Sequence, residues 1–71
     1  MTKIVQQLRV IREDKRMSQQ SLAEMTNISR VSISRYERGI IQPNIKALEK
    51  MAFILGYEIG LKPQQLPFLD T

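Results

Sequence analysis

Residues 18 to 39 read SQQSLAEMTNISRVSISRYERG, and this stretch predicts two short helices joined by a tight turn. Ser18 and Ser29 are suitable N-cap residues, one for each helix. Asn27 tolerates a positive φ better than most residues, so it can end the first of these helices abruptly. Apolar residues flank both caps at the spacing of hydrophobic staples, which stiffen the turn. The pairs are Met17 with Leu22 and Ile28 with Ile33.

A further helix is predicted before this stretch. Ile4, Leu8 and Ile11 recur at helical spacing, and Thr2 can cap the start. The link to the next helix, residues 15–17, is very short.

A fourth helix is predicted after Gly39. Pro43 and Asn44 suit its start, and Gly56 suits its end. The apolar stripe between them consists of Ile45, Leu48, Met51, Ala52 and Leu55. Residues 1–56 therefore predict a helical domain.

The pattern changes after Gly56, where Tyr57, Ile59 and Leu61 alternate with other residues at strand spacing. No other segment has strand spacing, so a pairing partner has to be the same strand of a second copy. We therefore interpret residues 57–71 as a strand and tail that form a homodimer. An extended tail that packs on the core is the alternative.

Composition excludes several classes of function. A chain of 71 residues has room for one domain, and it contains no cysteine or histidine. Zinc sites of the Cys/His type, thiol nucleophiles and imidazole bases are thus excluded, and no metal or cofactor is expected. Carboxylates such as Glu13 and Asp14 have no nucleophile or metal cluster beside them, so an enzyme is not expected.

The chain also has no apolar run long enough to span a bilayer and no signal-peptide pattern in MTKIVQQLRV. A cytoplasmic protein without a membrane partner is expected.

Positive charge indicates a polyanionic partner. Lysine and arginine number 11 against 7 acidic residues, for a net charge of +4. On a helix capped by Ser29, positions 30, 31, 34, 35 and 38 fall on one side, and Ile33 and Tyr36 fall on the other. Arg30 in the first turn opposes the helix dipole by roughly 0.3–1 kcal/mol, which a partner anion or a guanine edge offsets. Double-stranded DNA is the partner that fits.

Each side chain of this basic side has a chemical counterpart on DNA. The planar forks of Arg30 and Arg35 match guanine O6 and N7, Val31 can contact a thymine methyl, and Ser34 allows close approach. A solvated helix side with Glu37 as counterion is the structural alternative.

Phosphate contacts are expected around the helix starts. Backbone N–H groups at Ser18 and Gln19 can bind a phosphate, and Gln19 can also reach a base. Ser29, Arg38 and Asn44 complete the expected phosphate contacts, although Asn44 serves equally well as a helix cap only.

Arg12 and Glu37 have opposite charge and stand on the first and third helices. We interpret them as an ion pair that fixes the orientation of these helices more than it stabilises them. The alternative is two separate surface charges.

The chain resembles the Cro and phage-repressor type of helix-turn-helix protein, the XRE family, over about residues 4 to 56. The motif residues run from Gln19 through Leu22-Ala23, Asn27-Ile28-Ser29, Ile33-Ser34 and Tyr36-Glu37-Arg38-Gly39 to Pro43, Leu48, Ala52 and Leu55-Gly56. The resemblance implies an all-α fold, a compact lambda-repressor-like bundle of four or five helices. It also implies a transcriptional regulator that reads a palindromic operator as a homodimer.

The resemblance assigns Arg30, Val31, Ser34 and Arg35 to groove reading, Gln19 to a phosphate and base contact, and Arg12 with Glu37 to the interhelical pair. Asn27 departs from the glycine usual in the family. Residues 57–62 are similar to the strand of HipB-type antitoxins, which pairs across a dimer. An antitoxin that neutralises a protein toxin and regulates its own operon is therefore the alternative function.

Overall fold

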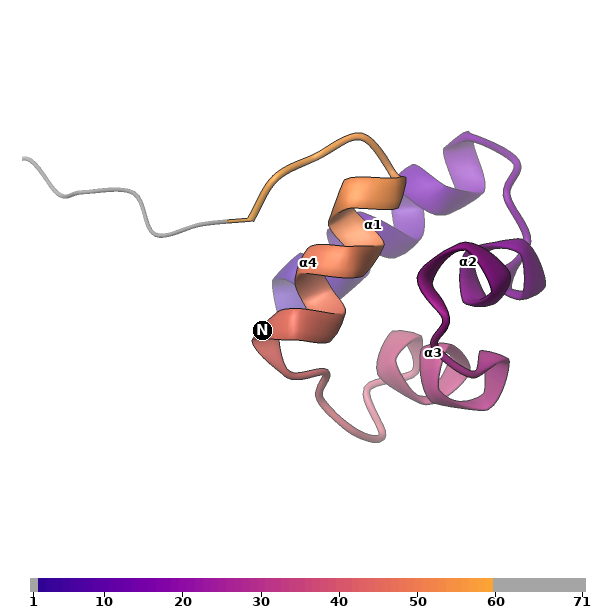
Figure 1. Ribbon diagram of the computed structural model, residues 1–71. Coiled ribbons are helices and arrows are strands. Elements are labelled where there is room, and N and C mark those ends of the chain that lie inside the picture. The colour runs from indigo at the N-terminus through magenta and orange to yellow at the C-terminus, as the bar shows by residue number, and fades with distance from the viewer. Residues whose placement is uncertain (1, 60–71) are drawn as a thin grey trace, which may run out of the picture.

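The computed structural model describes residues 2–59, which fold into four helices (Figure 1). They are α1 (Thr2–Asp14), α2 (Gln19–Thr26), α3 (Arg30–Glu37) and α4 (Ile45–Ile54). The described residues contain no strand, so the helical class expected from the sequence is confirmed for them. Tyr57 and Ile59 lie in irregular structure after α4, and the rest of the expected strand, including Leu61, lies outside the described residues.

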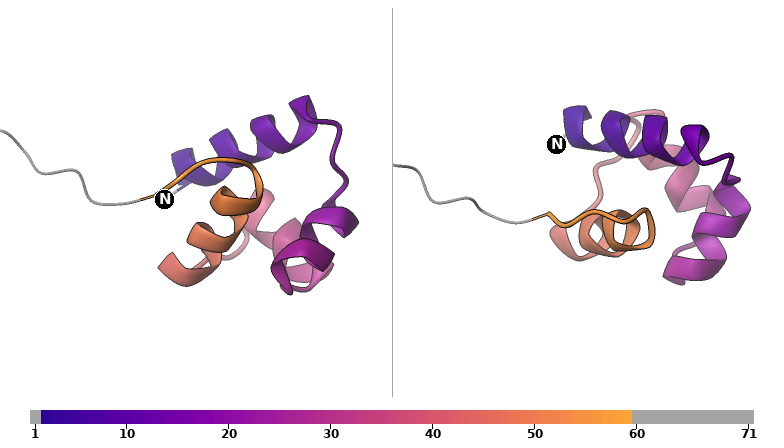
Figure 2. Two further views of the ribbon diagram at one scale, coloured as in Figure 1. Left: turned by 45° about the horizontal axis from the view of Figure 1, so that its top comes forward. Right: turned by 90° about the horizontal axis from the view of Figure 1, so that it is seen from above.

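α2 packs against α3 and α4, and α1 also packs against both. α1 and α4 lie on one side of the molecule, and α2 with α3 lies beyond the carboxyl end of α1 (Figures 1 and 2). α3 packs most closely against α1 and α2, and its Ile33 belongs to the same buried cluster as Leu48 of α4. One side of α3 is therefore held by two helices, and its other side is left open.

The core is small and apolar. Ile33, Leu48 and Ala52 have no exposed surface, and Leu22 and Leu55 are 1% exposed. Leu8, Ala23, Met51 and Val5 complete the buried cluster. Both expected staples contribute, because Met17 and Ile28 pack against the cluster that contains Leu22 and Ile33.

One expected core position is wrong, and two others are only partly buried. Ile45 was expected in the apolar stripe of α4, but it is the first residue of that helix and is 57% exposed. In α1, Val5 and Leu8 are buried, whereas Ile4 and Ile11 are half-buried. The buried side of α1 thus includes Val5 as well as Leu8, while Ile4 and Ile11 pack at the edge of the core and also line a groove.

Each of the four helices is followed within two residues by a residue with positive φ. Asn27 has a φ of 60°, which is the left-handed conformation predicted for it, and Gly39 and Gly56 end α3 and α4 in the same way. Arg16 is unexpected: its φ is 57°, and its N–H donates to the carbonyl of Glu13 at 2.9 Å. This closing turn of α1 lets α2 begin after a four-residue link.

Candidate nucleic-acid interface

The turn between α2 and α3 is fixed by side-chain hydrogen bonds. Ser18 Oγ accepts from the N–H of Ser21 at 2.9 Å, and Ser29 Oγ accepts from the N–H of Ser32 at 3.1 Å. Both predicted N-caps are confirmed. Thr26, which the sequence did not single out, is buried and donates its hydroxyl to the carbonyl of Leu22 at 2.7 Å. The start of α3 is therefore held at a set angle to α2.

The open side of α3 is basic. Arg30 and Arg35 are exposed, Val31 is 53% exposed, and Ser34 is half-buried. Arg38, the C-cap residue of α3, is exposed as well. The opposite side carries Ile33 and Glu37, which are 0% and 5% exposed. The inner side of α3 is thus fixed against the rest of the protein, and its outer side is cationic.

Glu37 is the centre of a buried polar network. Its carboxylate accepts two hydrogen bonds from Arg12, from Nε at 2.8 Å and from Nη2 at 2.9 Å. Arg12 is itself 7% exposed and donates from Nη1 to the carbonyl of Met17 at 2.7 Å. A bidentate pair of this kind gives directional as well as electrostatic restraint. It connects the end of α1, the link before α2, and the end of α3.

Two glutamines extend the network beyond the pair. Gln19, the first residue of α2, donates from Nε2 to Glu37 Oε1 at 2.8 Å. Gln6 of α1 donates from Nε2 to the backbone carbonyl of Glu37 at 2.8 Å. No buried side-chain nitrogen or oxygen among the described residues lacks a partner. α3 is therefore held at its carboxyl end by groups from both α1 and α2.

Three of the side chains expected near phosphates serve as helix caps. Ser18 and Ser29 cap α2 and α3 as described, and Asn44 Oδ1 accepts from the N–H of Ala47 at 2.8 Å. The side-chain oxygens of these three residues already accept hydrogen bonds from the helix. An anion can therefore bind only to the remaining free backbone N–H groups in the first turn of each helix. Arg38 differs, since no ion pair engages its guanidinium within residues 2–59.

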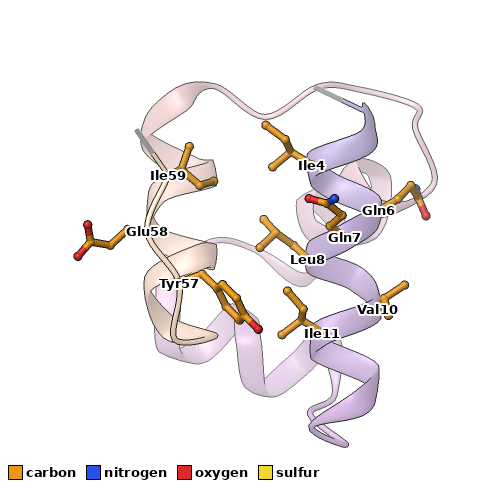
Figure 3. A pocket seen from close by; sticks show the side chains of 9 residues that line it. All are labelled: Ile4, Gln6, Gln7, Leu8, Val10, Ile11, Tyr57, Glu58 and Ile59. Atoms are coloured by element: carbon orange, nitrogen blue, oxygen red, sulfur yellow. The ribbon is translucent and has the colours of Figure 1, made fainter. Parts of the chain in front are cut away.

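An apolar groove of about 770 Å³ lies away from α3, between α1 and residues 57–59 (Figure 3). Ile4, Leu8 and Ile11 project from α1 toward Tyr57 and Ile59 on the opposite wall. Tyr57 is 54% exposed and Ile59 is half-buried. Of the residues expected to form the dimer, Tyr57 and Ile59 thus line an apolar surface that no other residue of the described range 2–59 covers.

Residues 2–59 contain no group of three or more His, Cys, Asp or Glu side chains placed to hold a metal ion. None of their helices combines the length and apolarity needed to cross a membrane.

Comparisons with known proteins place this arrangement in context. A family model described as "Helix-turn-helix" matches residues 8–62. An uncharacterized HTH-type transcriptional regulator of Sinorhizobium fredii is 40% identical over 63 residues, which are 89% of this chain and 32% of that protein. The immunity repressor protein of Bacillus phage phi105 is 33% identical over 55 residues, which are 78% of this chain and 38% of the repressor. The chain therefore spans about a third of the length of these curated relatives. No solved structure is significantly similar to it.

Proposed function

This chain belongs to the XRE-type helix-turn-helix family, and we propose that it is a sequence-specific repressor of transcription that binds double-stranded DNA through α3. One observation carries the proposal: α3 exposes its basic side while Glu37 and Ile33 lock its inner side. A helix held in this way can place side chains in the major groove without losing its orientation. The named phage relative, an immunity repressor, supports repression over activation.

In this proposal Arg30 and Arg35 read guanines. Each guanidinium can donate two hydrogen bonds to O6 and N7, and a good bidentate pair is worth about 1–3 kcal/mol of discrimination against another base. Val31 offers its methyl groups to a thymine methyl, and Ser34 keeps the backbone close to the groove floor.

Phosphates are bound at the edges of this surface. The backbone N–H groups in the first turns that follow Ser18, Ser29 and Asn44 can donate hydrogen bonds to phosphate oxygens. The positive ends of the three helix dipoles favour the negative charge of the phosphate. Arg38 adds a charged contact near the end of α3. These contacts set the position of the protein on the duplex and carry no sequence information themselves.

The proposed operator is palindromic and the proposed repressor is a homodimer. Two copies of α3 about 34 Å apart meet successive major grooves on one side of B-DNA. The apolar groove beside Tyr57 and Ile59 supports a dimer. A strand of a second copy that covers this groove would remove its apolar surface from water, which stabilises the dimer. We propose that the residues from Tyr57 onward, Leu61 included, pair with their equivalents across the dimer axis.

The proposal is tested by selecting bound duplexes from a random library with the full chain. We expect an enriched palindrome with half-site centres about 10 base pairs apart. Arg35→Ala should abolish the preference for guanine at one position of each half-site. Lys50→Ala, which removes the same charge from an exposed position on α4, should leave the motif unchanged. Failure to enrich any motif, or an unchanged motif with Arg35→Ala, would contradict sequence reading by α3.

Dimerisation has its own test in light-scattering measurements of molar mass. Tyr57→Ser should raise the dissociation constant of the dimer and weaken operator binding while the selected motif stays the same. Phe53→Ser is the matched control, since Phe53 is 75% exposed and lies outside the groove. A wild-type chain that occupies its operator as a monomer would contradict the proposed dimer. The antitoxin alternative gains no support from the relatives, whose names mention regulation and repression only.

A further inference from the structure

We propose that the apolar groove between α1 and residues 57–59 receives residues 66–69 of a second copy of this chain. These four residues, Leu-Pro-Phe-Leu, form a tail segment that lies outside the described range. The assignment rests on the proposed homodimer and deepens it, because it names what fills the groove of each copy.

The groove has the size and the chemistry of a site for an apolar segment. Its volume of about 770 Å³ falls in the range of about 300–1,000 Å³ that is usual for pockets that bind ligands. A stripe of Ile4, Leu8 and Ile11 on α1 faces residues 57–59 across it (Figure 3). Glu58, the one charged residue that the described range contributes to the lining, projects away from the groove. An apolar occupant is therefore favoured over a charged one.

The proposed strand pairing leaves this space open. The register that pairs all three apolar residues of the strand is antiparallel and symmetric about Ile59, and it places Leu61 opposite Tyr57 of the second copy. On the other side of the ribbon, Glu58 and Lys62 of the second copy become diagonal neighbours of opposite charge. The second strand lies about 4.8 Å to the side of the first, so it widens one wall of the groove and does not fill the space between the walls.

The same register directs the tail segment toward the groove of the second copy. Tyr57 of the second copy lines that groove, and the tail segment begins five residues after Leu61, which pairs with it. Five extended residues span up to about 17 Å. The stripe from Ile4 to Ile11 is only about 10 Å long at the rise of an α-helix. In an antiparallel ribbon the chain also moves away from its own α1, so the groove within reach is that of the second copy.

The tail segment matches the stripe in length and polarity. Pro63 and Pro67 have no N–H group for a ladder, so they end the ribbon and favour an extended polyproline conformation. In that conformation Leu66 and Leu69 share one side and lie about 9 Å apart, close to the length of the stripe. The two leucines can thus pack along α1, which leaves Phe68 for the opposite wall.

The first test uses disulfide formation, because the chain contains no cysteine of its own. Gln7→Cys is on the exposed rim of the groove, and Asp70→Cys directly follows the tail segment. Oxidation of the double variant should give a covalent dimer on a non-reducing gel, and neither single variant should give one. The matched control is Asp14→Cys with Asp70→Cys, because Asp14 is exposed on α1 outside the groove. This control should stay unlinked.

Two results would overturn the assignment. A covalent monomer would place the tail segment in the groove of its own chain, and cross-linking no greater than in the control would leave the groove without it. A wild type that still forms a dimer and selects a palindrome would retain the proposed function in both cases. A wild type that stays a monomer on its operator would remove the proposed dimer together with its tail contact.

Fluorescence gives a second measurement, because the chain contains no tryptophan. The emission of Phe68→Trp should shift to shorter wavelength as the concentration rises through the dissociation constant of the dimer measured by light scattering. Phe68→Ser should raise that constant about 10-fold or more through loss of a buried aromatic ring from each copy. Phe53→Ser, at a position that is 75% exposed and outside the groove, should leave it unchanged. An emission maximum that does not follow dimerisation, or equal effects of the two serine variants, would contradict docking of the tail segment in the second copy.

Discussion

Removing the charge of Glu37 is expected to destabilise the protein severely. Arg12 and Glu37 are 7% and 5% exposed, and the substitution Glu37→Gln leaves the guanidinium buried with two neutral acceptors, the new amide oxygen and the carbonyl of Met17, and with one carboxylate at 3.8 Å, that of Glu13. It also places an amide donor among the donors of Arg12 and Gln19. Breaking one partner of a buried pair typically costs about 3–5 kcal/mol.

That loss is large for a chain of this size. At roughly 0.05–0.15 kcal/mol per residue, 71 residues give a free energy of unfolding of roughly 4–11 kcal/mol. Denaturation by urea, followed by circular dichroism of the helices, measures the change. Glu49→Gln is the control, since Glu49 is exposed and makes no ion pair within residues 2–59, and a surface substitution of this kind changes stability by about 0.5 kcal/mol or less. If Glu37→Gln cost under about 1 kcal/mol, or no more than the control, the network would not hold α3 as argued.

Three further predictions concern helix ends and salt. Arg16→Gly should raise the free energy of unfolding by about 0.5–1 kcal/mol in the same urea assay, because a left-handed φ strains a residue with a Cβ; a decrease would contradict the assigned turn. Ser18→Ala should lower it by about 1 kcal/mol through loss of the cap of α2, and an unchanged midpoint would argue against that cap. Operator affinity should fall steeply with salt, and Arg38→Gln should reduce the slope of log K against log salt by about 1 per protomer; a parallel line would remove Arg38 from the phosphate contacts.

The helix boundaries could be predicted because they depend on local interactions. Ser18, Ser29 and Asn44 each cap a helix through the N–H group three residues later, so the sequence alone contains both partners. Asn27 has the same local character, since its left-handed φ needs only a tolerant side chain. The positive φ of Arg16 does not have this local character. An arginine has no intrinsic preference for positive φ, and the conformation there follows from the short link between two packed helices.

The polar network could be predicted only in part. Arg12 and Glu37 stood out because their charges are opposite, but Gln19 and Gln6 are neutral and lie 18 and 31 residues from Glu37. One signal was present: Glu37 falls four residues after the apolar Ile33, which puts its carboxylate on the inner side of the helix, where a buried carboxylate needs hydrogen-bond donors. The position of the groove beside Tyr57 could not be predicted, because it depends on how α1 and α4 pack.

The central claim, that α3 reads guanines in the major groove, is tested most directly by methylation interference on the selected duplex. Methylation of guanine N7 occupies the major-groove acceptor that an arginine fork needs, whereas methylation of adenine N3 marks the minor groove. We predict that N7 methylation of guanines in either half-site blocks binding by the wild type. Binding by Arg35→Ala should no longer be sensitive to methylation of one of these guanines in each half-site. Binding that tolerates N7 methylation throughout, and is blocked from the minor groove instead, would contradict the account.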